Sequence, residues 1–154
     1  MKIIEPFNSN TGKFTSLFNC NNAIFLAGPC PRSKFDEDWR YDAFKILQDI
    51  GFNGIVITPT NKYFDKMLDE FGFSSEKARQ QQVAWERTAM HVASAIVFWV
   101  PRSDKFPART TNYEFGEWYK KSNILVGWPD GAEHNEYMEC KLKKKKTQKK
   151  TRKT

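Results

Sequence analysis

The sequence predicts an α/β fold: a single doubly wound domain with a parallel sheet of about four to five strands and helices on both faces. The first observation is that short runs rich in β-branched and aromatic residues alternate with longer amphipathic segments, a pattern typical of β-α-β units. The second is the length, since 154 residues suffice for one domain with a core but not comfortably for two. Right-handed crossovers and short connections then favour the strand order 2-1-3-4.

Four apolar runs are predicted to form the strands: residues 23–27, 53–58, 95–100 and 123–127. A glycine or a proline stands at or just after the end of each run, and both residue types interrupt strands. The run at 95–100 is uniformly apolar before Pro101, which is typical of a strand buried on both faces.

Amphipathic spacing and start signals predict helices over residues 36–50, 75–92 and 132–142, a short helix within 63–71, and a helix that starts near Thr111. Trp39, Ala43, Leu47 and Ile50 form the expected inward face of the first helix. Ser74 or Ser75 is the expected N-cap of helix 75–92, whose inward face is Trp85, Ala89 and Val92. Phe115, Trp118 and Tyr119 form one apolar stripe on the helix after Thr111.

Composition divides the chain into a lead-in segment (1–21), an α/β domain (22–140) and a disordered basic tail (141–154). The lead-in is polar and fits a loose segment or an edge strand. The tail has eight Lys, one Arg and no acidic residue, so the rest of the chain carries 16 basic and 18 acidic residues. A block of like charge repels itself and stays unfolded. Two functions fit such a tail, namely nucleic-acid binding through counterion release and a solubilising end with no partner.

Several classes of protein are excluded by what the sequence lacks. No apolar stretch approaches the roughly 20 residues of a membrane helix, and the first residues lack a signal-peptide pattern, so we expect a cytoplasmic protein with no membrane partner. The three cysteines have no zinc or redox spacing, and the two histidines, His91 and His134, stand far from any metal-like set. Neither a dinucleotide fingerprint nor a phosphate-binding P-loop occurs. We therefore expect no metal and no cofactor.

The candidate site lies where the predicted strand order reverses, between the strands at 23–27 and 95–100. Ligands of open α/β sheets bind at the carboxyl ends of the strands at this point, so the loops 28–33 and 101–111 should meet there. Glu114 is expected in the first turn of the helix that follows, where free N–H groups and the helix dipole favour a negative charge. The alternative is structural, because Thr111 and Glu114 also fit a capping box.

The chain resembles the nucleoside 2-deoxyribosyltransferase-like family, closest to a branch found in bacteria and phages. The matching segments occur in the family's order and cover about residues 22–140. They are IFLAGPCPR (24–32), DWRYDAFKIL with GFNGIVITP (38–59), QVAWE (82–86), ASAIVFWVPR (93–102), TTNYEFGEW (110–118) and VGWPDGAEHNEY (126–137).

The resemblance implies an enzyme of the glycosyltransferase class, with a Rossmann-like fold, that cleaves an N-glycosidic bond. Glu114 would be the nucleophile that attacks C1′ of a 2′-deoxynucleoside or its 5′-monophosphate, and another base or water would then take the sugar. Glu86 would bind the sugar or orient the nucleophile; its alternative is an exposed helix acid. The implied partners are the deoxynucleoside or deoxynucleotide, a free nucleobase, and further copies of the chain that complete the pocket.

The resemblance also assigns substrate-binding roles to a set of residues around the two acids. Gly28 and Pro29 would shape the sugar pocket, and Asn112, preceded by Thr111, would contact a sugar hydroxyl or a base edge. The remaining candidates are Phe25, where the wider family often has a tyrosine, Trp99 for stacking on a base, and Arg32 and Arg102 for a 5′-phosphate. Core aromatics and solvated loop arginines are the alternatives for these residues.

Two positions depart from the family pattern. Ala108 stands where well-known transferases have an aspartate, and Ser94 replaces an acid expected before the buried strand. These departures leave open a non-catalytic nucleotide-binding module, tethered to nucleic acid by the basic tail. A glycohydrolase acting on another ribosyl compound is a third possibility.

Overall fold

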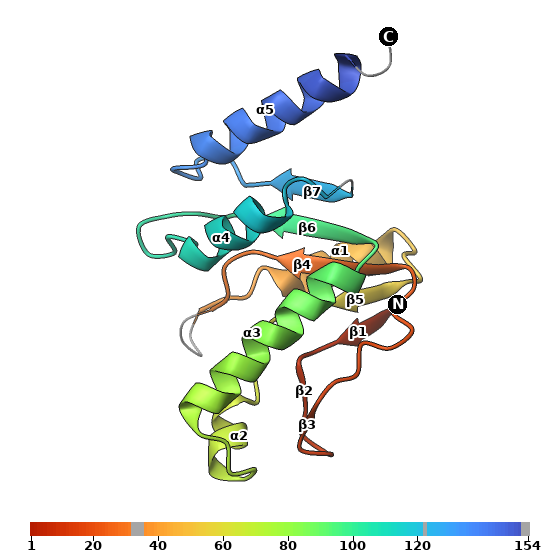
Figure 1. Ribbon diagram of the computed structural model, residues 1–154, viewed down its shortest axis with the longest axis vertical. Coiled ribbons are helices and arrows are strands. Elements are labelled where there is room, and N and C mark those ends of the chain that lie inside the picture. Colours follow the sequence, from red (N-terminus) through yellow and green to blue (C-terminus); the bar gives the residue numbers. More distant parts are fainter. Residues whose placement is uncertain (32–35, 122, 152–154) are drawn as a thin grey trace.

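The computed structural model describes residues 1–31, 36–121 and 123–151. It contains a five-stranded parallel sheet in the order β1-β5-β4-β6-β7 (Figure 1). The strands are β1 (Lys2–Ile4), β4 (Ala23–Ala27), β5 (Ile55–Ile57), β6 (Ala95–Trp99) and β7 (Ile124–Gly127), and β2 (Phe7–Asn8) pairs separately with β3 (Lys13–Phe14) in an antiparallel ribbon.

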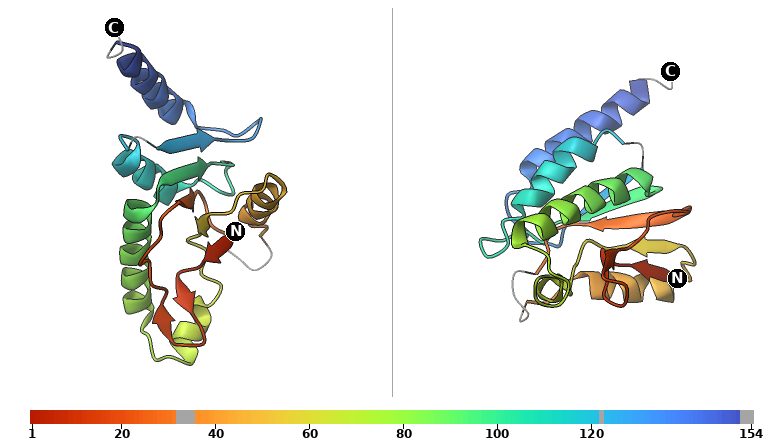
Figure 2. Two further views of the ribbon diagram at one scale, coloured as in Figure 1. Left: turned by 90° about the vertical axis from the view of Figure 1, so that its right-hand side faces the viewer. Right: turned by 60° about the horizontal axis from the view of Figure 1, so that its bottom comes forward.

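Helices cover both faces of this sheet, as the sequence predicts. The helices are α1 (Arg40–Asp49), α2 (Phe64–Asp69), α3 (Ser75–Val92), α4 (Arg109–Trp118) and α5 (Glu136–Thr151). Helices α3 and α4 lie on one face and α1 lies on the other (Figure 2). Among the described residues, none of the helices combines the length and the apolar character that crossing a bilayer requires.

The four predicted strands are confirmed in the predicted order, because β5, β4, β6 and β7 follow one another across the sheet. The fifth strand comes from the lead-in segment. Strand β1 pairs in parallel with β5, with Ile3 opposite Val56, so the lead-in contributes an edge strand. At the centre, Ala27 of β4 lies opposite Phe98 of β6, and the loops after these two strands therefore start side by side.

The helices differ from the predictions mainly at their ends. Helix α3 matches its prediction, and the Ser74 hydroxyl accepts a bond from the N–H of Lys77 at 3.2 Å. Helix α1 begins at Arg40 and not at residue 36. Ile50, which was expected on its inward face, is 71% exposed. Val92 is likewise exposed, and Met90 is buried in its place.

Helix α5 continues through Thr151, where the sequence predicts an unfolded tail from residue 141. Two local features support this extension. Met138 is buried and Leu142 packs against the main core, which fixes the first turns, and Lys143 pairs with Glu139 at 2.7 Å. Lysine is a good helix former, so the helix propagates into the basic segment, and it extends away from the sheet (Figure 1).

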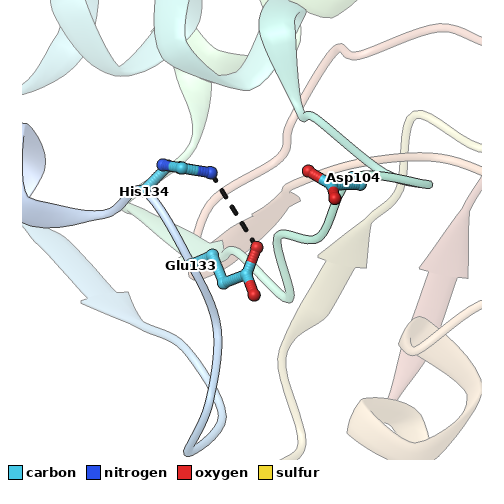
Figure 3. Close-up of side chains that lie close together, drawn as sticks. All are labelled: Asp104, Glu133 and His134. Carbon is cyan, nitrogen blue, oxygen red and sulfur yellow. Dashed lines mark ion pairs between the residues drawn. The ribbon is translucent and has the colours of Figure 1, made fainter.

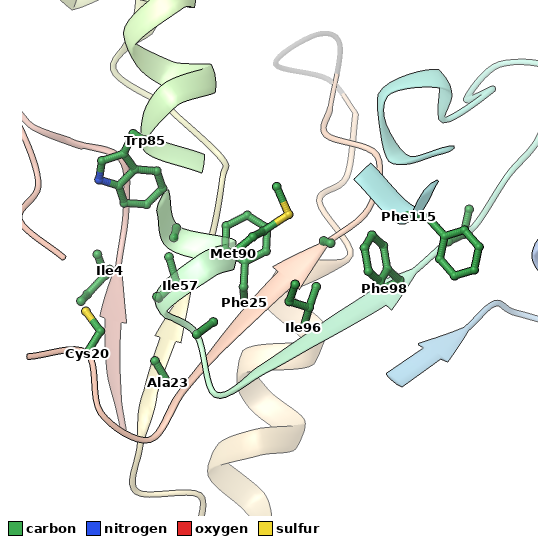
Figure 4. Close-up of a cluster of buried hydrophobic side chains, with 14 of the residues drawn as sticks. Ile4, Cys20, Ala23, Phe25, Ile57, Trp85, Met90, Ile96, Phe98 and Phe115 are labelled. Atoms are coloured by element: carbon green, nitrogen blue, oxygen red, sulfur yellow. The ribbon is translucent and has the colours of Figure 1, made fainter. Parts of the chain in front are cut away.

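The core lies mainly between the sheet and the two helices, α3 and α4, that cover one of its faces (Figure 4). Trp85 and Met90 from α3 and Phe115 from α4 pack there against side chains of the strands, among them Ile57, Phe25 and Phe98. Phe98 and Phe115 meet edge to face with 5.7 Å between ring centroids. This contact fixes α4, and with it the residues just before Phe115, over the end of β6.

The close approach of the loop after β4 to strand β6 predicts that Gly28→Ala is strongly destabilising. Gly28 has φ +150°, and a Cβ there would lie 2.2 Å from the carbonyl oxygen of Trp99. Because alanine disfavours this φ and the Trp99 oxygen is part of the sheet backbone, we expect a loss of at least about 2 kcal/mol in the free energy of unfolding, measured by denaturant titration.

The matched control is Gly116→Ala on α4, where an added Cβ meets nothing within 4 Å. That change should stabilise the protein by about 0.5–1 kcal/mol, because alanine is the better helix former. Equal effects of the two substitutions would contradict the described packing of the loop after β4 against β6.

Candidate functional site

A pocket of about 350 Å³ lies at the carboxyl ends of the central strands. The loop after β4, Pro59 after β5, a turn of α3 and the first turns of α4 form its walls. Glu86 comes from α3 and Glu114 from α4, and both line it. The topology therefore brings two carboxyl groups from distant parts of the sequence into one cavity, at the place where the strand order predicts a ligand.

Glu114 does not occupy the first turn of α4, and this corrects two expectations. Because α4 begins at Arg109 with Ala108 as its N-cap, Glu114 is the sixth helical residue and lies in the second turn. Thr111 is the third helical residue and not the cap, and no side chain caps the helix. The capping-box alternative for Thr111 and Glu114 is therefore wrong.

The protonation of Glu114 also differs from the expectation of a carboxylate that the helix dipole keeps charged. The pKa of Glu114 is raised from 4.5 to about 7, mainly by burial and then by the nearby charge of Glu86; Arg40 acts in the opposite direction, and Glu117 adds a smaller increase. Desolvation outweighs the dipole because the dipole acts mainly within the first turn. Near neutral pH Glu114 is therefore protonated in about half of the molecules.

Glu86 is held in place by a glutamine one turn earlier on α3. The Gln82 amide donates to Glu86 Oε1 at 2.6 Å and to the carbonyl of Pro59 at 2.9 Å, and its oxygen accepts a bond from Asn61 at 2.9 Å. Burial raises the pKa of Glu86, and the Gln82 hydrogen bond and the charge of Arg40 offset part of this increase. Glu86 is thus a fixed, partly buried group and not the exposed helix acid of the alternative interpretation.

Arg40 lies behind the pocket and was not identified from the sequence. Its side chain is 1% exposed and donates to the carbonyls of Leu26, Gly28 and Pro29 at 3.1, 2.8 and 3.2 Å, and to Asp38 at 3.1 Å. These bonds fix the loop after β4. In the sequence Arg40 is one more polar residue near a helix start, and nothing in its spacing distinguishes it.

Asp38 joins this loop to the loop after β5. One carboxylate oxygen accepts bonds from the N–H and the guanidinium of Arg40, and the other accepts the Thr60 hydroxyl at 2.7 Å. Because Pro59, the residue before Thr60, accepts a bond from Gln82, Arg40 and Glu86 are linked by hydrogen bonds on either side of this short backbone segment. The two walls of the pocket are therefore positioned by one network.

Of the other predicted site residues, the structure places Gly28, Pro29 and Thr111 at the pocket with the two acids. Cys30, Pro31, Phe106, Arg109 and Thr110 also line it and were not proposed as ligand contacts from the sequence. Burial is the main cause that raises the pKa of the Cys30 thiol, and the charges of the nearby carboxylates of Glu86, Asp38 and Glu114 raise it as well. Arg40 lowers it, but by less than burial raises it. A neutral thiol of this kind is a poor nucleophile.

Phe25, Trp99 and Asn112 do not line the pocket. Phe25 is fully buried in the main core (Figure 4). Trp99 presents its backbone oxygen to Gly28, and its ring lies against Gly127, so it is not in position to stack on a base in this pocket. Asn112 is exposed on the surface of α4.

Arg102 also lies outside the pocket lining, which argues against its predicted contact with a 5′-phosphate. Its guanidinium is buried and donates to Asn135 at 3.2 Å, to the carbonyl of Pro107 at 2.9 Å, and to Asn112. These bonds hold the loop before α4 against the start of α5. Arg32, the other arginine predicted to contact phosphate, lies outside the described residues.

His134 belongs to a group of three potential metal ligands, contrary to the sequence prediction that both histidines stand apart (Figure 3). The ligand atoms of Asp104, Glu133 and His134 lie within 4.8 Å of one another, with 3.8 Å between His134 Nε2 and a Glu133 oxygen. All three residues are exposed and none lines the pocket. The group therefore has no part in the chemistry of the two acids.

A family model described as "Nucleoside 2-deoxyribosyltransferase like" matches residues 21–132. The match includes strands β4 to β7, Arg40 and both acids of the pocket. No curated protein matches the chain significantly.

The raised pKa of Glu114 predicts how stability changes with pH. The folded state holds the proton more tightly than the unfolded chain, so the stabilisation is complete below pH 4.5 and is lost as pH rises through about 7. Glu114→Gln, which is neutral at every pH, should therefore gain about 2 kcal/mol relative to the parent protein between pH 5 and pH 8. Denaturant titrations at the two pH values measure this difference.

Glu76→Gln, at an exposed position on α3, is the control and should change stability by a similar small amount at both pH values. A Glu114→Gln effect that does not depend on pH would contradict the buried, proton-binding state described for this carboxyl group.

Proposed function

The chain belongs to the nucleoside 2-deoxyribosyltransferase-like family, and from this premise we propose that it cleaves the N-glycosidic bond of a 2′-deoxynucleoside or its 5′-monophosphate through a covalent ester on Glu114. One observation carries the proposal: Glu114 and Glu86, from two different helices, line the same pocket at the carboxyl ends of the central strands. Most enzymes that break a glycosidic bond use a pair of carboxyl groups.

In the first step, a carboxylate oxygen of Glu114 forms a bond to C1′ while the bond from C1′ to the base nitrogen breaks. The electron pair of that bond leaves with the base, which takes up a proton from water. In the second step, the oxygen of water or a nitrogen of another base forms a bond to C1′ while the bond from C1′ to Glu114 breaks; the attacking group gives its proton to water, and Glu114 is released as a carboxylate. Both steps pass through a sugar with cation-like character at C1′.

The electrostatics of the pocket suit this reaction. A buried carboxyl group with a pKa of about 7 is ionised in a substantial fraction of molecules at neutral pH, and its charge is poorly solvated, which favours attack on a cation-like carbon. Glu86, fixed by Gln82, is suited to holding a sugar hydroxyl or stabilising the developing positive charge. Arg40 is buried behind the loop and offsets the negative charge of the pair without entering the pocket lining.

The direct test is release of free base from the four common 2′-deoxynucleosides and their 5′-monophosphates, with and without an acceptor base, followed by chromatography. We expect Glu114→Ala to lower turnover by a factor on the order of 1,000 or more, because the covalent step is lost. Glu117→Ala is the matched control, since Glu117 lies one turn further along α4 and pairs with Arg87 at 2.9 Å. A 2′-fluoro deoxynucleoside should leave a mass adduct on Glu114.

A folded parent protein that releases no base from any of these substrates would contradict the proposal. Nucleotide binding without release would then favour the non-catalytic module of the same family. Base release that survives in Glu114→Ala would retain the reaction class but remove the assigned nucleophile.

The coupling of the two acids predicts a pH profile. Because Glu114 must be ionised to attack, kcat/KM should rise with pH and reach half its maximum near pH 7 in the free enzyme. Glu86→Gln removes a negative charge that raises the pKa of Glu114, so its midpoint should move to lower pH while the maximal rate falls. Glu117→Gln should move the midpoint in the same direction by less, because Glu117 is the weakest of the causes that raise this pKa. An upward shift in Glu86→Gln would contradict the assignment of Glu114 as the ionising group.

A further inference from the structure

We propose that α5 is a DNA-docking helix, whose lysine-rich part lies in the major groove of double-stranded DNA and binds the phosphates on both sides of the groove. The inference is independent of the reaction proposed for the pocket, because none of the described residues of α5 lines that pocket. It also goes beyond the sequence-based expectation for residues 141–154, which was an unfolded tail with any nucleic acid, or nothing, as its partner.

The first turns of α5 are anchored to the domain. Met138 is 2% exposed, and Leu142 packs against the main core. Just before the helix, the buried side chain of Asn135 accepts a bond from Arg102 at 3.2 Å, and its carbonyl accepts the N–H of Glu139 at 3.0 Å. The helix therefore starts from a fixed point of the fold and then extends away from the sheet (Figure 1; Figure 2, left).

Charge is divided along α5. Its acidic residues lie in the first turn, whereas lysine occupies seven of the eleven positions from 141 to 151. The two lysines nearest the domain have partners within it, since Lys141 lies over the Tyr137 ring at 5.4 Å and Lys143 pairs with Glu139 at 2.7 Å. The five lysines beyond them are Lys144, Lys145, Lys146, Lys149 and Lys150. Because the chain up to residue 140 has 16 basic and 18 acidic residues, its excess of positive charge is concentrated on this helix.

The lysine positions surround the axis of α5. Successive residues of an α-helix are about 100° apart, so these seven positions leave no gap much wider than about 100° around the axis. The major groove of DNA is about 12 Å wide and admits an α-helix, which then has a row of phosphates on either side. A helix with charge all around its axis suits this arrangement, whereas on a flat acidic surface about half of its lysine positions would face away.

Composition argues against other acidic partners. Residues 143–151 include no apolar residue, whereas a helix that lies on a membrane buries an apolar face in it. Residues 138–151 include no aromatic residue, and proteins that hold single strands stack the bases on aromatic rings. Double-stranded RNA has a deep, narrow major groove that side chains cannot enter. Duplex DNA is therefore the partner that fits, and contacts from lysine to phosphate make its binding largely independent of base sequence.

The salt dependence of binding measures these contacts. Anisotropy of a fluorescent DNA duplex, titrated with the full chain at several salt concentrations, gives the association constant. We expect its logarithm to fall with the logarithm of the salt concentration with a slope of about −4 to −6, since each neutralised phosphate contributes about −0.9. No binding at low salt would overturn the proposal and favour a solubilising end with no partner.

A charge variant tests whether α5 makes the contacts. It replaces four lysines beyond the anchored turns with glutamine, which also favours a helix, namely Lys145→Gln, Lys146→Gln, Lys149→Gln and Lys150→Gln. The slope should become shallower by about 3–4, and Kd should rise at least about 100-fold at low salt.

The matched control removes the same charge from four exposed lysines elsewhere, namely Lys2→Gln, Lys13→Gln, Lys45→Gln and Lys77→Gln. It should keep the slope and the Kd of the parent protein. Equal losses in the two variants would show that the overall charge binds the DNA, and would overturn α5 as the docking element.

A second pair of variants tests the helix itself at constant charge. Thr147→Pro interrupts α5 beyond its anchored turns, and Thr147→Ala preserves it; far-UV circular dichroism verifies both. We expect Thr147→Pro to bind the duplex about ten-fold more weakly than Thr147→Ala, because part of the charge no longer lies along the groove. Equal binding would overturn the docked helix in favour of an unfolded basic tail. Tighter binding to phosphatidylserine vesicles, duplex RNA or single-stranded DNA than to duplex DNA would overturn the assigned partner.

Discussion

The buried guanidinium of Arg40 is the constraint on which the pocket depends. Arg40 donates to the carbonyl of Leu26 in β4 and to two carbonyls of the loop that follows, and Asp38 balances its charge at 3.1 Å. A charge buried in this way is tolerable only when every donor finds an acceptor, so the loop, the start of α1 and Thr60 must keep their relative positions. The close contact of Gly28 with β6 fixes the same loop from its other side, because it leaves no space between the loop and the neighbouring strand.

The same guanidinium also sets the electrostatics of the two acids. Burial raises the pKa of each of the two carboxyl groups, and the charge of Glu86 raises that of Glu114 as well. Arg40 lowers the pKa of both Glu86 and Glu114 from behind the loop, and it therefore favours their ionised forms. A cation inside the cavity would compete with the sugar for these carboxylates. Arg40 cannot compete in this way, because its guanidinium is hydrogen-bonded to backbone carbonyls behind the loop. The pocket therefore remains negative at its centre and open to a ligand.

The sequence predicted those features that depend on hydrophobic pattern and topology. The four strands and their order follow from short apolar runs, and the position of Glu114 near the site follows from the switch point of an α/β sheet. The place of Glu86 in the site came from the resemblance to the family. The features that depend on individual side chains were not predictable in this way. Arg40 appears as a polar residue near a helix start, and Arg102 appears as a loop cation although its donors are engaged by Asn112, Pro107 and Asn135. Helix α5 extends beyond its predicted end because its first turns are anchored by buried Met138.

The most informative failure concerns where α4 begins. The capping-box pattern predicted a start at Thr111, but Ala108 adopts a left-handed conformation with φ 50°, and the helix begins right after it. Had Thr111 been the cap, its hydroxyl and Glu114 would have satisfied the terminal N–H groups themselves, and neither would have been available to a ligand. The earlier start leaves the terminal N–H groups without a side-chain cap, places Thr111 in the wall of the pocket, and places Glu114 in the second turn, where burial governs its pKa.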